Sequence, residues 1–323
     1  MAVGPTLSVL ITYHEEGPLL GECIRSFLEQ AAPPDEVLVH DDASRPEAAA
    51  SAHVPADDRV RVIVAAPPSR GPAYGRNRLL EEARGEYVHF HDADDLALPG
   101  WGTLVRGALA ARPDAVYTDV ASCDEAGQEI SPRVLGLEPR HAESAADWVR
   151  VCLEGIVLTP AGTHRRRRLL EVGGYDEGLW GREDWDLTLR LALTRGYLPI
   201  VIPRPAVRIR LRAASLSHRA SLQAEHGLLA LRKAGGYLPA EHRPWLADVA
   251  LRAGLELHAG GQAAAARAYF ELARELGPAS MDRLGLRRGL LLRLLGPERY
   301  AAATKLYRST VPGALRRRLG RRQ

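Results

Sequence analysis

The chain has 323 residues, of which 46% are apolar and 26% are charged, a composition typical of folded globular proteins and unlike that of disordered ones. The net charge of +3 is unevenly distributed, because residues 222–323 carry 18 Lys and Arg against 8 Asp and Glu, whereas the preceding part is acidic. The three cysteines, Cys23, Cys123 and Cys152, form no C-x-x-C pair, which argues against a disulfide framework and a zinc knuckle.

Cysteine usage of this kind favours a reducing cytoplasm. The first residues lead almost directly into a strand-like run, so we expect no secretory leader. No apolar run reaches the roughly 18–20 residues that a membrane span requires, so we expect no such span.

Strands and helices alternate over the first hundred residues. Apolar runs predict strands at residues 7–12, 36–40, 60–64 and 86–91. Helical spacing predicts a helix after Pro18 that ends before Pro33-Pro34, and a second near residues 74–84. This alternation predicts an α/β fold with a mostly parallel sheet and flanking helices.

The remainder of the chain is less regular and then becomes helical. A strand is expected at residues 115–120 and a helix between residues 181 and 196. Beyond residue 216 the pattern is wholly helical and includes one hairpin, similar to a tetratricopeptide unit, around a Gly-Gly turn. We therefore expect two domains, residues 1–215 and a helical region 216–323 with a basic tail.

Polar clusters follow three of the predicted strands. They read "TYHEE" at 12–16, "HDDAS" at 40–44 and "HDADD" at 91–95. In parallel sheets ligands bind beyond the carboxyl ends of the strands, so these clusters should converge on one edge.

The third cluster has the composition of a metal site. Asp92, Asp94 and Asp95 would repel one another unless a proton or a cation balanced them. Carboxylate oxygens suit Mg²⁺ or Mn²⁺, which keep positions open for substrate phosphates. Taken alone, such a motif is more often an acidic solvated loop, here with Asp94 or Asp95 capping the following segment.

Four blocks together resemble the inverting family 2 glycosyltransferases, which have the GT-A fold. They are "LSVLITYHEEGPLLGECIRSFLEQ", "DEVLVHDDAS", "GPAYGRN" with the following "EYVHFHDADD", and "VGGYDEGLWGREDWDLTLRLALTRGY". They occur in the family's order over residues 6–210, and the helical region is not covered. Two positions depart from the family pattern, since Ile11 stands where Pro is usual and Ala43 where Gly is usual.

The resemblance implies a donor site and a metal site. It assigns nucleotide-sugar binding to Thr12, Tyr13, Glu15, Asp42, Arg76, Asn77 and Asp92. It assigns the metal, Mg²⁺ or Mn²⁺, to Asp92 and Asp94, with Asp95 supporting the turn. His218 is a candidate for an extra ligand, although Arg212 lies nearer the place where the family often has a His.

The resemblance also implies a general base. It places this role on Asp184, beside Glu183, where the base would take the proton of an acceptor hydroxyl as the hydroxyl attacks the anomeric carbon. One in-line displacement then inverts that centre without a protein nucleophile. The alternative is structural, because carboxylates in the first turn of a helix are favoured by the helix dipole.

Some other features have simpler explanations. The run Arg165–Arg168 could clamp a diphosphate, but a run of charges is more often a solvated helix face. Trp180 and Trp185 could stack on a sugar ring, and a core role is as good a reading for Trp185.

The expected partners follow from the resemblance and the basic tail. The family often builds surface polysaccharides on lipid-linked acceptors, so we expect a nucleoside-diphosphate sugar donor and a hydroxyl acceptor such as a lipid-linked glycan. The basic tail fits an anionic membrane surface, which suggests a cytoplasmic enzyme peripheral to the inner face of the cell membrane. We expect no nucleic-acid partner.

Two alternative functions remain. A nucleotidyltransferase would need a basic, Gly-rich loop after the first strand, where this chain is acidic. A non-catalytic nucleotide-sugar-binding scaffold would lack the acids, which are intact.

Overall fold

The computed structural model describes residues 4–155, 157–212, 219–279, 292 and 295–310. The chain divides into two compact units, residues 1–219 and 220–323. The boundary expected from the sequence, between residues 215 and 216, lies outside the described residues, as do His218 and the tail beyond residue 310.

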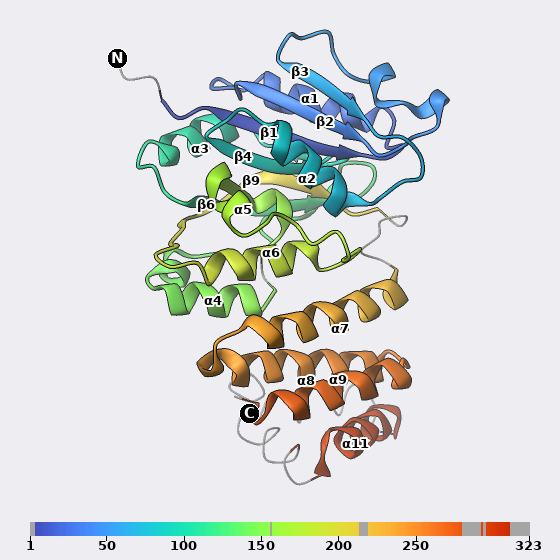
Figure 1. Ribbon diagram of the computed structural model, residues 1–323. Helices are drawn as coiled ribbons and strands as arrows, with labels where there is room; N and C mark the ends of the chain where they lie inside the picture. Colours follow the sequence, from blue (N-terminus) through green and yellow to red (C-terminus); the bar gives the residue numbers. More distant parts are fainter. Residues whose placement is uncertain (1–3, 156, 213–218, 280–291, 293–294, 311–323) are drawn as a thin grey trace. The chain divides into compact units, whose positions relative to one another are not determined.

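A mixed sheet forms the centre of the first unit (Figure 1). Its strands within the described residues are β1 (Leu7–Tyr13), β2 (Glu36–Asp41), β3 (Val60–Val64), β4 (Tyr87–Asp92), β5 (Leu96–Ala97), β6 (Ala115–Cys123), β7 (Glu129–Ser131), β8 (Gly162–Arg165) and β9 (Ile200–Arg210). Their order is β3-β2-β1-β4-β8-β6-β9-β5, and β7 pairs with β6. The first four strands in this order are parallel, and the antiparallel β8 joins them to the parallel pair β6 and β9.

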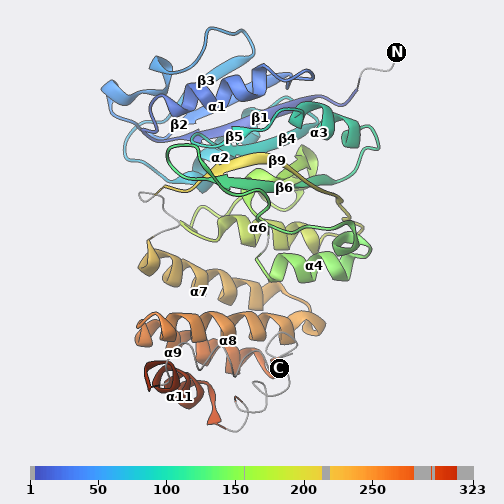
Figure 2. The same ribbon diagram turned by 180° about the vertical axis from the view of Figure 1, so that it is seen from behind.

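Helices cover both faces of this sheet, which confirms the predicted α/β class. They are α1 (Leu19–Leu28), α2 (Pro72–Glu82), α3 (Trp101–Leu109), α4 (Ala145–Leu153), α5 (Arg166–Glu171) and α6 (Glu183–Ala192). Helices α1 and α3 lie on one face and α2 and α5 on the other (Figures 1 and 2). Phe27 of α1 meets Trp101 of α3 edge to face at 4.7 Å, whereas Arg166 of α5 donates to the Leu80 carbonyl of α2.

The central strands are buried on both sides because helices pack against each face. In β1, the residues from Leu7 to Ile11 are all fully buried, and Thr12 near the carboxyl end is only partly buried. Continuous apolar runs are the expected sequence of such strands. In β1 the polar Thr12 stands near the carboxyl end, where the candidate site lies, and Ser8 is a polar residue buried within the strand.

The second unit is helical, as expected from its sequence. Its described helices are α7 (Ala220–Tyr237), α8 (Arg243–Ala259), α9 (Ala263–Leu276) and α11 (Pro297–Thr310). The turn between α8 and α9 includes Gly261 at φ +87°, a conformation that favours glycine. The Tyr269 hydroxyl donates to the Ala224 carbonyl at 2.8 Å and ties α9 to α7. None of the described helices combines the length and the apolar character needed to cross a membrane.

Candidate active site

The ends of β1, β2 and β4 lie side by side at the carboxyl edge of the sheet. Thr12 is in register with His40 of β2 and with Asp92 of β4. The Thr12 hydroxyl lies 3.4 Å from Asp92 Oδ1. The predicted convergence of the three polar clusters is thus confirmed, at the edge where parallel sheets bind ligands.

The three carboxylates after β4 have different surroundings. Asp95 is 5% exposed, and its Oδ1 accepts the backbone N–H of Arg210 at 2.8 Å. Burial raises the pKa of Asp95 well above its usual range, and the charge of Asp92 adds to the rise. Burial also raises the pKa of Asp94, again with a contribution from Asp92. Asp95 therefore fixes the acidic turn, residues 92–95, to β9.

The two glutamates after β1 have different surroundings. Glu15 adopts φ +67°, and its two carboxylate oxygens each accept a hydrogen bond from the Arg45 guanidinium at 2.9 Å. These bonds lower the pKa of Glu15 to about 2. Burial raises the pKa of Glu16, and the charges of Asp94 and Asp92 raise it further. Glu16, which is not among the predicted site residues, is thus influenced by the charges of the acidic turn.

Tyr13 and Asp42 hold loops at this edge. The buried Tyr13 hydroxyl donates to the Ala48 carbonyl at 2.5 Å. The Asp42 carboxylate accepts from the Ser69 hydroxyl at 2.7 Å and from the Gly71 N–H at 2.8 Å. Asp42 thereby fixes the loop that leads into α2. In the described structure both side chains shape the edge through these loops.

Arg76 connects the acidic turn to the start of α6. Its side chain is 5% exposed and donates to Asp92 Oδ1 at 2.8 Å and to Glu183 Oε1 at 2.7 Å. Burial opposes the charge, but Asp92, Tyr175 and Glu183 outweigh it, so the pKa of Arg76 is raised. A buried guanidinium between two carboxylates is a rigid link, because moving it away would leave the guanidinium and the 12% exposed Glu183 without this pairing.

The loop before α6 is fastened to α2. Asn77 Oδ1 accepts the Tyr175 N–H at 2.8 Å, and Asn77 Nδ2 donates to the Tyr175 carbonyl at 2.9 Å. The Trp180 ring packs on Gly71, where an added Cβ would lie 3.2 Å from ring atoms. Trp185 is 6% exposed and donates to the Leu153 carbonyl, so it belongs to the core. The structure thus places Asn77 at this loop, with its amide turned toward Tyr175.

Glu183 and Asp184 open α6 in different environments. The preceding Arg182 adopts the left-handed region at φ +65°, which turns the chain sharply into the helix. Glu183 is paired with Arg76. Asp184 Oδ1 accepts the N–H of Trp185 at 2.7 Å. Burial, followed by the charge of Glu183, raises the pKa of Asp184 to about 6. Such a value suits a general base near neutral pH.

Two arginines at and just after the end of β9 contact the acidic turn. The Arg210 side chain donates to the Asp94 carbonyl at 3.1 Å. The Arg212 guanidinium donates to Asp94 Oδ2 at 3.1 Å. Nothing in the sequence near β9 marks these residues beyond the position of Arg212, where the resemblance suggests a His.

The acidic turn fits a cation that is shared with a substrate. Within the described residues, no three His, Cys, Asp or Glu side chains are grouped so as to hold a metal ion. Asp92 and Asp94 supply carboxylates from one turn, and Mg²⁺ is commonly bound by one or two carboxylates together with substrate phosphates. The donor set therefore suits a cation completed by a diphosphate. His218, the further candidate ligand, is not among the described residues.

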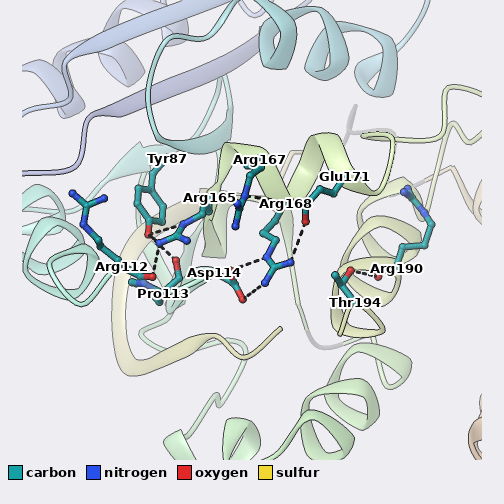
Figure 3. A network of polar contacts seen from close by, with 10 residues as sticks. All are labelled: Tyr87, Arg112, Pro113, Asp114, Arg165, Arg167, Arg168, Glu171, Arg190 and Thr194. Carbon is teal, nitrogen blue, oxygen red and sulfur yellow. Dashed lines mark hydrogen bonds and ion pairs between the residues drawn. The ribbon is translucent and has the colours of Figure 1, made fainter. Parts of the chain in front are cut away.

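The arginine run is not a solvated helix face, contrary to the expectation. Arg165 ends β8 and donates to the Tyr87 hydroxyl at 3.0 Å, and Arg168 donates to both carboxylate oxygens of Asp114 at 2.8 and 3.1 Å (Figure 3). Arg166 donates to backbone carbonyls of α2. Arg167 is the exposed member, at 66%. Three of the four arginines, Arg165, Arg166 and Arg168, therefore join β8 and α5 to their neighbours.

Comparison with known proteins identifies a family. The family model described as "Glycosyl transferase family 2" matches residues 8–170. An uncharacterized protein of Sinorhizobium fredii, y4gI, is 32% identical over 194 residues, which cover 58% of this chain and 20% of that protein. The O-antigen biosynthesis protein RfbC of Myxococcus xanthus is 30% identical over 193 residues, covering 58% of this chain and 14% of RfbC. This chain spans less than two thirds of the length of these relatives.

A solved structure shares the fold. The crystal structure of S. aureus TarS residues 1–349 in complex with UDP-GlcNAc superimposes with a TM-score of 0.71 at 18% identity, covering 94% of this chain and 92% of that chain. The likeness confirms the expected GT-A fold with an added helical region. At this identity it bears on the fold alone.

Proposed function

The chain belongs to glycosyl transferase family 2, and on that premise we propose that it is an inverting, metal-dependent enzyme using a nucleoside-diphosphate sugar. The observation that carries the proposal is the Arg76 link, which joins Asp92 at 2.8 Å and Glu183 at 2.7 Å. This link holds the start of α6 beside the acidic turn. A base on α6 and a leaving group at the turn can then flank one sugar.

Asp184 is proposed as the general base. Its neighbour Glu183 is engaged by Arg76, whereas burial raises the pKa of Asp184 to about 6. At neutral pH Asp184 is largely ionised and can accept a proton. The Asp184 carboxylate would take the proton of the acceptor hydroxyl while the hydroxyl attacks the anomeric carbon and the nucleoside diphosphate departs.

Asp92 and Asp94 are proposed to hold Mg²⁺ or Mn²⁺ together with the donor diphosphate. The cation would supply charge stabilisation of the leaving group. The nucleotide would lie against Thr12, which is beside Asp92, and against the loops that Tyr13 and Asp42 fix. Glu15 and Asn77 would act indirectly, through Arg45 and Tyr175.

The names of related proteins suggest the biological setting. The S. aureus structure holds UDP-GlcNAc, which makes uridine-diphosphate sugars the first donors to test. The Myxococcus relative is named for O-antigen biosynthesis, which supports polysaccharide synthesis as the process. A lipid-linked glycan acceptor fits that process. Contact of a cytoplasmic enzyme with an anionic membrane surface would depend on the basic tail, which lies outside the described residues.

The test compares Asp184→Asn with the wild type. Water can replace the acceptor hydroxyl, so slow hydrolysis of UDP-, GDP- and dTDP-sugars with Mn²⁺ measures the same base. We expect Asp184→Asn to lower hydrolysis by about 10²–10⁴-fold while donor affinity, measured by calorimetry, changes little. Glu271→Gln, at an exposed position on α9, is the matched control. Hydrolysis by Asp184→Asn at the wild-type rate would refute the assignment of the base. Absence of any donor binding by the wild type would refute the proposed function.

A further inference from the structure

Arg210 and Arg212, at and just after the end of β9, both contact the acidic turn, and they differ in the number of their other contacts. Arg210 ends β9, and its side chain is 10% exposed. Its backbone N–H binds Asp95, and its guanidinium donates to the carbonyls of Asp94 and Glu125 and to the Glu22 carboxylate. So many contacts make Arg210 part of the scaffold.

Arg212 lies two residues further along, after the strand has ended. Its side chain is 29% exposed, and within the described residues its one partner is Asp94 Oδ2 at 3.1 Å. One contact is therefore all that has to break for the Arg212 guanidinium to leave Asp94, whereas Arg210 would have to break several. The Arg212 side chain can therefore leave Asp94 without disturbing the fold.

The other guanidinium beside the turn cannot move in this way. Arg76 is 5% exposed and bridges Asp92 and Glu183. Moving it away would take the partner from the Glu183 carboxylate, which is 12% exposed, and would leave the buried guanidinium unpaired. A diphosphate that enters beside Glu16, Asp92 and Asp94 nevertheless needs positive charge.

We propose that Arg212 exchanges partners during donor binding, leaving Asp94 for the donor diphosphate while a divalent cation takes its place on Asp94. This inference rests on the proposed function and assigns a role to one more residue of the same site. In the free protein Arg212 neutralises Asp94. In the loaded protein the guanidinium binds phosphate oxygens, and Asp94 and Asp92 bind the cation.

The exchange couples the two ligands. A cation that arrives alone must displace Arg212 from Asp94, and a diphosphate that arrives alone meets an acidic turn. Each ligand therefore improves the affinity for the other by the same factor, as thermodynamic linkage requires. Removal of the guanidinium should favour the lone cation and disfavour the diphosphate, two effects of opposite sign that general damage to the site would not produce.

The test measures both affinities on the full chain of Arg212→Gln. Electron paramagnetic resonance follows free Mn²⁺, and calorimetry at saturating Mn²⁺ follows UDP, GDP and dTDP. We expect Mn²⁺ alone to bind about threefold more tightly than to the wild type, and the nucleoside diphosphate to bind about tenfold less tightly. Arg167→Gln, an exposed arginine away from the site, is the control and should change neither value.

Arg212→Lys adds a second measurement, because it keeps the charge and should restore part of the diphosphate affinity. The proposal is overturned if Mn²⁺ alone binds Arg212→Gln no more tightly than the wild type, or if nucleoside-diphosphate affinity is unchanged. If the wild type binds no nucleoside diphosphate, the proposed function fails. In that case the Mn²⁺ titration still decides whether Arg212 competes for Asp94.

Discussion

At the residue scale, the two adjacent carboxylates at the start of α6 differ in their partners. Glu183 pairs with the buried Arg76 at 2.7 Å. The Asp184 carboxylate accepts the N–H of Trp185 instead. Burial together with the charge of Glu183 raises the pKa of Asp184 to about 6. The carboxylate without an arginine is therefore the one whose proton affinity is tuned for exchange near neutral pH.

The pH dependence of activity follows from this value. A base works only when ionised, so kcat/KM should fall about tenfold per pH unit below pH 6 and level off above it. The profile of donor hydrolysis measures this limb. An acid limb near the ordinary aspartate range would contradict the assignment.

The same shift predicts a pH-dependent gain of stability in Asp184→Asn. Because the folded-state pKa lies above the unfolded value of 3.8, the folded state loses stability as pH rises from 3.8 to about 6. The Asn variant has no such loss. Its free energy of unfolding should exceed that of the wild type by up to about 3 kcal/mol at neutral pH. Thermal melts at neutral pH and near pH 3.8 check this, since the gain should vanish at the lower pH.

At the element scale, α2 carries Arg76 and packs closely on β1 and β2. A Cβ at Gly75 would lie 2.8 Å from His40 Nδ1 and 3.2 Å from Thr12 Cγ2. His40 is 1% exposed and cannot move aside easily. The missing side chain at Gly75 thus allows the helix to bring Arg76 to Asp92.

Gly75→Ala should therefore shift α2 and lose about 1–3 kcal/mol of unfolding free energy, with weaker donor binding. Gly107→Ala on α3 is the matched control, because nothing lies within 4 Å of its added Cβ. Helix propensity predicts that Gly107→Ala is about 0.5–1 kcal/mol more stable than the wild type. Denaturant titration compares the two. Equal stabilities would show that α2 tolerates the methyl group.

The junction of β8 and α5 depends on arginines that the sequence presents as one run (Figure 3). Arg168 is 18% exposed and pairs with Asp114 and Glu171, whereas Arg167 is 66% exposed. We expect Arg168→Gln to lower the unfolding free energy by about 1–3 kcal/mol and Arg167→Gln by less than about 0.5 kcal/mol. Both should bind the donor as the wild type does. Loss of donor affinity without loss of stability in Arg168→Gln would instead indicate a phosphate clamp.

At the scale of the whole molecule, the described site lies within the first of two compact units, residues 1–219. Its residues extend from Thr12 to Arg212. A fragment of residues 1–219 should therefore fold and bind the nucleoside diphosphate with an affinity within about threefold of the full chain. Calorimetry with Mn²⁺ measures this. A folded fragment that binds no nucleotide would show that the helical unit completes the site.

The sequence by itself determined β1 to β4, β6, α1, α2, α6 and the edge at which the acids gather, whereas β5, β7 to β9 and α3 to α5 were not predicted from it. The spacing of apolar residues and the residue types of a short segment are enough to predict a strand or a helix. Parallel connections then place the carboxyl ends of the strands, such as Thr12 and Asp92, at the same edge of the sheet. Asp92 and Asp94 stand out because they follow a buried strand, whereas the choice of Asp184 rests on the resemblance to the family.

Only the tertiary structure decided which charges pair. Arg76 meets Glu183 across 107 residues of sequence, and Arg212 meets Asp94 across 118. Glu15 pairs with Arg45, whereas the pKa of Glu16 is raised by burial and by the charges of Asp94 and Asp92. Such choices depend on register, on backbone rotation after a strand and on what packs opposite, and none of these is encoded in a local pattern. The physical reason is that charge pairing is set by distance in space, whereas a motif specifies only distance along the chain.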